Sequence, residues 1–136
     1  MDVFRVLVVD DELDFLETIV KRLKRRKVDA TGVDSGKKAL EILEKQHFDV
    51  VILDVRMPGM DGIETLKEIK RVRPLMEVIM LTGHASVESG MQGMQLGAFD
   101  YVLKPADIDE LLEKVQQAYE RKSLHEEKIR QSKDII

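Results

Sequence analysis

The feature that most limits the fold of this chain is the alternation of short apolar runs with segments of helical periodicity. Four runs are continuously apolar, as expected for strands buried on both faces of a sheet: residues 6–9, 50–53, 78–81 and 101–103. A fifth, more mixed run at residues 28–33 is typical of an edge strand. Five β-α repeats with right-handed crossovers predict an α/β fold, a five-stranded parallel sheet with helices on both faces.

Polar residues mark the beginnings of the predicted helices. Ser35, Asp61, Ser86 and Asp107 stand at N-cap positions, and Glu110 follows Asp107 at the spacing of a capping box. These residues accept hydrogen bonds from backbone amides that a first helical turn leaves without partners.

Composition limits the classes of function. The 136 residues predict one domain, and the absence of cysteine excludes a disulfide framework, a thiolate metal site and a cysteine nucleophile. A net charge of −4 argues against direct nucleic-acid binding by this segment. No apolar run approaches the roughly 18 residues of a membrane span. We therefore expect a cytoplasmic protein that binds neither nucleic acid nor membrane directly.

Charged and polar residues directly follow four of the predicted strands. Asp10 and Asp11 follow the first strand, and Asp54 ends the third. Thr82 follows the fourth, and Lys104 the fifth. The carboxyl ends of parallel strands form one edge, and ligands bind there where the strand order reverses. If the order is 2-1-3-4-5, a common order of such sheets, the three carboxylates converge.

This combination of side chains indicates phosphoryl chemistry. Three convergent carboxylates repel one another, and a hard cation with oxygen ligands, Mg²⁺, would hold them together. Lys104 supplies a point charge and Thr82 a hydroxyl donor. A carboxylate beside a metal, a lysine and a hydroxyl can attack phosphorus and form an aspartyl phosphate. Taken singly, each residue has an ordinary role as a helix cap, turn or loop residue.

The motifs that contain these residues resemble the receiver domains of response regulators. They are residues 8–12 (VVDDE), 53–62 (LDVRMPGMDG), 81–83 (LTG) and 101–105 (YVLKP). The resemblance covers residues 1 to about 120. It implies a flavodoxin-like fold, a phospho-accepting switch rather than an enzyme, a sensor histidine kinase or phosphotransfer protein as donor, and an output domain or partner protein.

The resemblance also implies the roles of the acidic residues. Asp54 would be the site of phosphorylation. Asp11, Asp54 and the backbone carbonyl of Arg56 would bind Mg²⁺, with Asp10 assisting through water.

By the same resemblance, Thr82 and Lys104 would contact the phosphoryl group. When Thr82 turns towards this group, Tyr101 would rotate into the vacated space, and the surface of the fourth helix, fifth strand and fifth helix would change. Arg56 and His84 lie at variable positions whose side chains would tune hydrolysis of the phosphoryl group.

The predicted fourth helix contains Gly90 and Gly93, each of which costs roughly 1 kcal/mol relative to alanine in a helix interior. We expect it to be among the least stable helices. Val87, Met91 and Met94 form either an adaptable stripe for a partner or a face packed on the sheet.

Residues 1–120 are predicted to form the receiver domain, and residues 121–136 a charged helical tail or linker. Either a single-domain regulator or the N-terminal part of a longer protein fits this pattern, and the length of the tail favours the longer protein. A homodimer through the tail or the fourth helix is left open.

Three other functions deserve comparison. A phosphatase of the haloacid dehalogenase type would place a second aspartate two residues after Asp54, where this chain has Arg56. A flavodoxin would need a phosphate-binding loop after the first strand, where this chain has carboxylates. A receiver that serves only as an interaction module would not need the complete acidic set.

Overall fold

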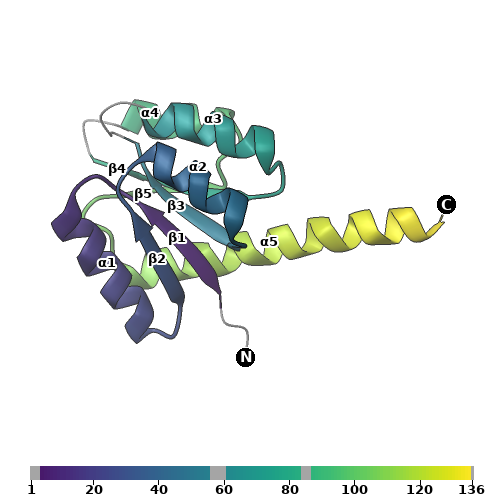
Figure 1. The fold of residues 1–136 in the computed structure, drawn as a ribbon, viewed down its shortest axis with the longest axis horizontal. Coiled ribbons are helices and arrows are strands. Elements are labelled where there is room, and N and C mark those ends of the chain that lie inside the picture. The colour runs from purple at the N-terminus through teal and green to yellow at the C-terminus, as the bar shows by residue number, and fades with distance from the viewer. Residues whose placement is uncertain (1–3, 56–60, 84–86, 136) are drawn as a thin grey trace.

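The computed structural model describes residues 4–55, 61–83 and 87–135. Five parallel strands form one sheet in the order β2-β1-β3-β4-β5. The strands are β1 (Arg5–Val9), β2 (Asp29–Val33), β3 (Val50–Asp54), β4 (Glu77–Thr82) and β5 (Asp100–Leu103). The helices are α1 (Leu13–Arg25), α2 (Gly36–Lys45), α3 (Gly62–Val72), α4 (Val87–Gln95) and α5 (Ile108–Ile135). The predicted fold class and strand order are confirmed (Figure 1).

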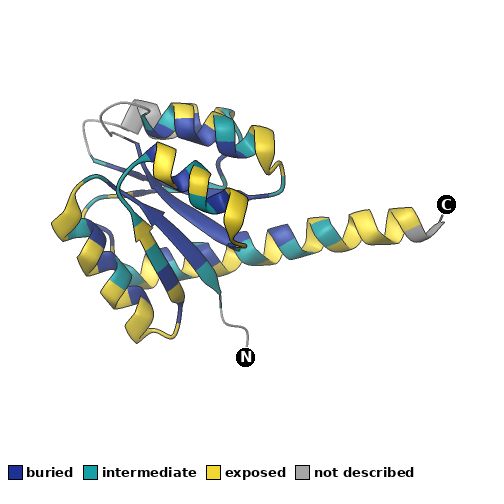
Figure 2. Cartoon of the chain, in the orientation of Figure 1, coloured by how far each residue is buried: buried dark blue, intermediate teal, exposed yellow. Residues whose placement is uncertain are grey.

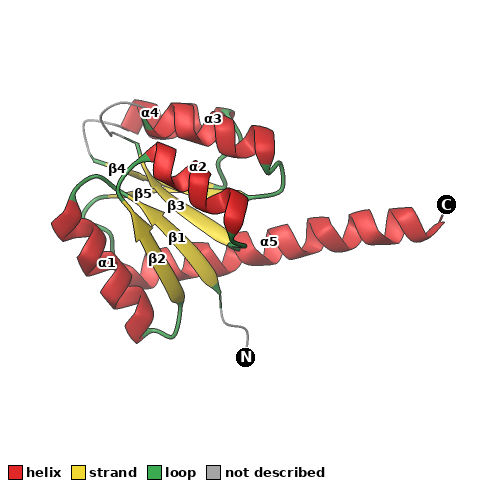
Figure 3. Ribbon diagram, viewed as in Figure 1, coloured by secondary structure: helices red, strands yellow, loops and turns green. Residues whose placement is uncertain are grey.

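Helices cover both faces of the sheet (Figure 3). One cluster of buried side chains joins the sheet to α1 and α5 and includes Val6 and Val8. A second cluster joins it to α2 and α3 and includes Leu7 and Val9. Successive strand residues point to opposite faces, so a strand covered on both sides must be apolar throughout. The central strands are accordingly buried, whereas the outer surfaces of the helices are exposed (Figure 2).

The strand at residues 28–33 is an edge strand, as predicted. In the structure β2 pairs with β1 alone among the described strands. Its burial is mixed, because Ala30 is buried whereas Asp29 and Gly32 are exposed. An edge strand meets fewer apolar neighbours than a central one, which explains its mixed composition.

Helix capping matches the prediction at two positions. The side chains of Ser35 and Asp61 each accept a hydrogen bond from the backbone amide three residues later, at 3.1 and 2.9 Å. Asp107 accepts at 2.9 Å from the amide two residues later, so its partner is not the amide of Glu110 that a capping box would use. Ser86 lies outside the described residues.

In α4, one of the residues singled out from the sequence packs against the sheet and two others are exposed to solvent. A Cβ built on Gly93 would lie 3.2 Å from Cγ of Met80 on β4, so this glycine permits close approach of the helix to the sheet. Met91 and Met94 are 58% and 40% exposed. The chain leaves the helix through Gly97, whose φ of +101° is in the left-handed region that favours glycine.

The last helix is much longer than the others. α5 has 28 residues, and its C-terminal half extends beyond the body of the domain (Figure 1). At Arg121 it makes an ion pair with the buried Glu77 at the start of β4. Within the described ranges we find no helix that combines the length and the apolar character needed to cross a bilayer.

Candidate functional site

The carboxyl ends of β1 and β3 bring three aspartates together. The two strands are neighbours with Val9 opposite Leu53, so Asp10 follows one strand beside Asp54 at the end of the other. Asp10 and Asp54 are 0% and 4% exposed, while Asp11 is half-buried. One carboxylate oxygen from each residue lies within 4.8 Å of the other two. We call this cluster the acidic site.

Lys104 places its ammonium group over the acidic site. Its Nζ lies 2.9 Å from Oδ2 of Asp10 and 3.4 Å from Oδ1 of Asp54. Glu12 adds a third carboxylate oxygen at 3.4 Å. The backbone of Lys104 is fixed because its N–H donates to the carbonyl of Thr82 at 2.8 Å, just beyond the pairing of β4 with β5.

Opposing influences act on the pKa of Lys104. Burial alone would lower it, but the close polar contact with Asp10 and the charges of Asp54, Asp10 and Glu12 outweigh burial and raise the pKa above its ordinary value. Lys104 therefore stays protonated at neutral pH. It supplies a fixed positive charge next to three carboxylates.

The donor set fits a hard divalent cation. Oδ1 of Asp10 accepts the backbone amide of Glu12 at 2.9 Å. Oδ2 of Asp10 is buried beside Lys104, but no described residue gives it a hydrogen bond of good geometry. This oxygen therefore retains acceptor capacity for an ion or an ion-bound water. An all-oxygen site of carboxylates suits Mg²⁺.

Thr82 and Tyr101 lie on adjacent strands near the acidic site. Thr82 is fully buried at the end of β4, and its hydroxyl donates to the carbonyl of Gly83 at 3.0 Å. Tyr101 pairs with Met80, two residues before Thr82. Residues two apart on a strand share a face, so Thr82 and Tyr101 project from the same side of the sheet. Tyr101 is half-buried there.

A close backbone contact holds the strand that carries Asp54 against α3. The N–H of Gly62, the first residue of α3, donates to the carbonyl of Val55 at 3.0 Å. A Cβ at Gly62 would lie 2.2 Å from the carbonyl oxygen of Asp54. No side chain fits this position, so glycine is required by close approach.

Several predicted residues lie outside the described part of the chain. They include Arg56 and His84, and the same holds for the side chain of Val87 and the surroundings of Gly90. Their predicted roles stay predictions.

The sequence did not indicate two residues at the beginning of α1 that reach Lys104. Glu12 is one, and Phe15 is the other, with its ring centroid 4.5 Å from Nζ. Phe15 stands four residues after Asp11, in the first turn of the helix that follows the acidic residues. This spacing was the available signal, but it acquires meaning only once β5 is known to end beside α1.

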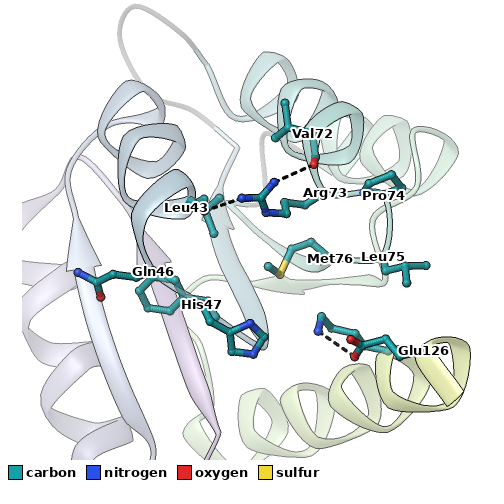
Figure 4. Close-up of a pocket in the computed structure, with 11 residues that line it drawn as sticks. Leu43, Gln46, His47, Val72, Arg73, Pro74, Leu75, Met76 and Glu126 are labelled. Carbon is teal, nitrogen blue, oxygen red and sulfur yellow. Dashed lines mark hydrogen bonds and ion pairs between the residues drawn. The ribbon is translucent and has the colours of Figure 1, made fainter. Parts of the chain in front are cut away.

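A separate pocket of about 310 Å³ lies near the amino ends of β3 and β4 (Figure 4). Its walls are Leu43, Gln46, His47, Phe48, Val72, Arg73, Pro74, Leu75, Met76, Lys122 and Glu126. Arg73 donates to the carbonyls of Leu43 and Val72, and Lys122 pairs with Glu126 at 3.0 Å. Arg73 and Lys122 therefore already have partners within the pocket. The pocket lies at the opposite end of the strands from the acidic site.

Comparison with known protein families shows to which family the chain belongs. The profile of the response regulator receiver domain matches residues 6–116, most of the 136-residue chain. This chain belongs to that family.

The receiver is similar to parts of two transcriptional regulators. It is 40% identical over 113 residues to the transcriptional regulatory protein ZraR of Escherichia coli (strain K12), covering 83% of this chain and 26% of ZraR. It is 39% identical over 113 residues to the DNA-binding transcriptional regulator NtrC of the same organism, covering 83% and 24%. The chain thus spans about a quarter of the length of these curated relatives.

Solved structures share the fold of the receiver. A response regulator receiver domain protein from Clostridium thermocellum has a TM-score of 0.86 and 35% identity, covering 90% of this chain and 98% of the other. A structure described as an adenylate cyclase from Rhodopirellula baltica has a TM-score of 0.90 and 28% identity, covering 97% and 98%.

Membership of this family excludes the phosphatase and flavodoxin alternatives. A receiver domain is a phospho-accepting regulatory module of two-component systems rather than a classical enzyme. The acidic site of Asp10, Asp11 and Asp54 agrees with the Mg²⁺ site of such domains.

Proposed function

We propose that Asp54 accepts a phosphoryl group from a sensor histidine kinase or phosphotransfer protein in a Mg²⁺-dependent reaction. The observation that carries this proposal is the convergence of three carboxylates within 4.8 Å, with the ammonium of Lys104 3.4 Å from Asp54. A buried carboxylate in this position has a lysine ammonium beside it and room for a metal ion, and these positive charges would allow it to meet an anionic phosphoryl group.

Asp11, Asp54 and the backbone carbonyl of Arg56 would hold the metal, with Asp10 assisting through water. When bound, Mg²⁺ supplies positive charge that neutralises phosphoryl oxygens. Asp10 is buried without a hydrogen bond to Oδ2 from the described residues, so a metal-bound water would complete its coordination.

In the transfer itself, a carboxylate oxygen of Asp54 forms a bond to phosphorus. The bond from phosphorus to the donor nitrogen breaks, and its electron pair stays with the donor imidazole, which then takes up a proton. Lys104 pairs with one phosphoryl oxygen, and Thr82 donates its hydroxyl to another. By the family pattern, Arg56 and His84 would tune the later hydrolysis of the aspartyl phosphate.

Phosphorylation would then alter the surface formed by α4, β5 and α5. Thr82 leaves its hydrogen bond to Gly83 for the phosphoryl group, and Tyr101, on the same face, moves into the vacated space. Exposed apolar side chains are available on this surface for a partner: Met91, Met94 and Leu103, the last 38% exposed. Flexible methionine side chains suit a surface that changes shape.

We further propose that residues 1–120 are the receiver and that residues 121–136 are a helical linker to an output domain. ZraR is named a transcriptional regulatory protein, and NtrC a DNA-binding transcriptional regulator. An output of this class would place nucleic-acid binding in another part of the protein. The receiver itself, with its net charge of −4, would control that part without contacting nucleic acid.

The test is incubation of the full chain with acetyl phosphate and Mg²⁺, followed by intact mass measurement and mapping of the modified residue. We expect one phosphoryl group on Asp54. It should be absent from the Asp54→Asn variant and from samples with a chelator. Asp14→Asn, a change on the exposed first turn of α1, serves as the matched control and should label like the wild type. Labelling of Asp54→Asn at the wild-type level would refute the proposal.

A further inference from the structure

The ammonium of Lys104 has an aromatic neighbour as well as acidic ones. Phe15, in the first turns of α1, places its ring under Nζ with the centroid 4.5 Å away. This lies within the roughly 6 Å over which the face of an aromatic ring attracts a cation. The side chain of Lys104 is 17% exposed, so water screens the contact only partly.

The ring and the carboxylates constrain Lys104 from different sides. A lysine side chain has four flexible carbons and loses considerable rotamer entropy when it is fixed. The carboxylates of Asp10, Asp54 and Glu12 attract the ammonium towards the strand ends. Phe15 is half-buried and packs on the core shared by α1, α5 and the sheet, so its ring gives Nζ a firm support.

We propose that Phe15 is a positioning residue, whose ring holds the ammonium of Lys104 where it can meet the phosphoryl group on Asp54. The inference rests on the proposed role of Lys104 in binding that group. If Phe15 only filled space, leucine would replace it, because leucine is apolar and of comparable size. The π-face of the ring is what leucine lacks.

The experiment compares Phe15→Leu with Phe15→Tyr in the full chain. Acetyl phosphate is the donor, Mg²⁺ is saturating, and the rate of Asp54 phosphorylation is followed by intact mass. Phe15→Leu should slow phosphorylation about threefold to tenfold, the effect of one cation–π contact in a partly desolvated site. Phe15→Tyr retains the ring and should stay within about twofold of the wild type. The affinity for Mg²⁺, measured by titration, should be unchanged in both.

Phe99→Leu is the matched control. The ring of Phe99 faces the guanidinium of Arg121 at 4.6 Å and precedes β5, at the opposite end of that strand from Lys104. Loss of this ring should leave the phosphorylation rate within about twofold of the wild type. If Phe15→Leu melts below the assay temperature, Phe15→Met provides a second ring-free variant of similar size.

Three results would overturn the inference: an unchanged rate in the ring-free variant, equal slowing by leucine and tyrosine, or a loss of Mg²⁺ affinity that accounts for the slower rate. These outcomes differ from failure of the proposed function. If the proposed function were wrong, the wild type itself would acquire no phosphoryl group on Asp54.

Discussion

At the scale of single residues, the acidic site is electrostatically incomplete. Asp10, Asp11 and Asp54 bring three carboxylates together, and Lys104 is the ammonium that contacts two of them. Negative charge is thus in excess, which costs stability in the metal-free protein and favours a divalent cation. Functional sites often lower the folding stability of a protein in this way.

Asp11→Asn should therefore stabilise the metal-free protein. Removing one of three repelling carboxylates relieves about 1 kcal/mol, which corresponds to a rise of about 4 °C in Tm in the presence of a chelator. Mg²⁺ should raise the Tm of the wild type but hardly that of the variant. A variant that melts lower than the wild type in chelator would contradict this account of the site.

Lys104→Met should affect metal and phosphoryl group in opposite directions. Loss of the ammonium removes a cation that repels Mg²⁺, so the Mg²⁺ affinity should rise. The phosphorylation rate should fall by about a hundredfold, the usual effect of removing one group that stabilises charge in a transition state. Mg²⁺ titration and intact mass kinetics measure the two quantities, and a parallel fall of both would argue against separate roles.

At the scale of elements, the site depends on how closely α3 approaches the end of β3. Gly62 opens α3 directly against the backbone of Asp54 and Val55. The helix thereby fixes the strand end that carries the proposed phospho-acceptor. This contact involves main-chain atoms, which cannot yield as a flexible side chain can.

Gly62→Ala should destabilise the receiver by about 2–3 kcal/mol, because its Cβ would lie 2.2 Å from the carbonyl oxygen of Asp54 and 2.7 Å from Cα of Val55. Urea denaturation measures the free energy of unfolding, and phosphorylation should slow as well because Asp54 is displaced.

Gly83→Ala is the matched control for this change. Gly83 also borders the site, but a Cβ there meets no described atom within 4 Å. The substitution should be neutral or stabilise by about 0.5 kcal/mol, since alanine restricts the unfolded chain. Equal destabilisation by both alanines would show that backbone freedom, rather than close approach, requires the glycines.

At the scale of the whole molecule, α5 is tied to the domain beyond the predicted boundary. Glu77 is 2% exposed, and its partner Arg121 is the first residue after position 120. Lys70 is a more distant neighbour at 3.9 Å. A buried carboxylate that loses its main counter-ion is costly, so the tail contributes to the stability of the receiver.

Truncation after Glu120 should lower the free energy of unfolding by about 2 kcal/mol, less than for a fully enclosed pair because Arg121 is partly exposed. Adding Glu77→Gln to the truncated chain should recover part of this loss, because the uncompensated charge is then removed. Four chains are compared by urea denaturation: the full and the truncated chain, each with and without Glu77→Gln. Their free energies of unfolding give the coupling between Glu77 and the tail.

Truncation after Glu127 is the control, since it retains Arg121 and the Lys122–Glu126 pair. It should unfold like the full chain. If both truncations were equally stable, the ion pair would not anchor the tail, and the boundary at residue 120 would stand as the end of the folded unit.

The sequence by itself determined the fold and the members of the acidic site. Short continuous apolar runs between helical segments are typical of strands covered on both faces, and residues that end parallel strands share one edge. The places of Asp10, Asp11, Asp54, Thr82 and Lys104 in the chain therefore predicted that they lie together. Contacts between residues distant in sequence were decided by tertiary structure alone. Phe15 under Lys104, Gly62 against Asp54 and Arg121 on Glu77 each depend on packing distances of a few ångströms. Local periodicity carries no information about such distances, because they are set by how whole elements pack against one another.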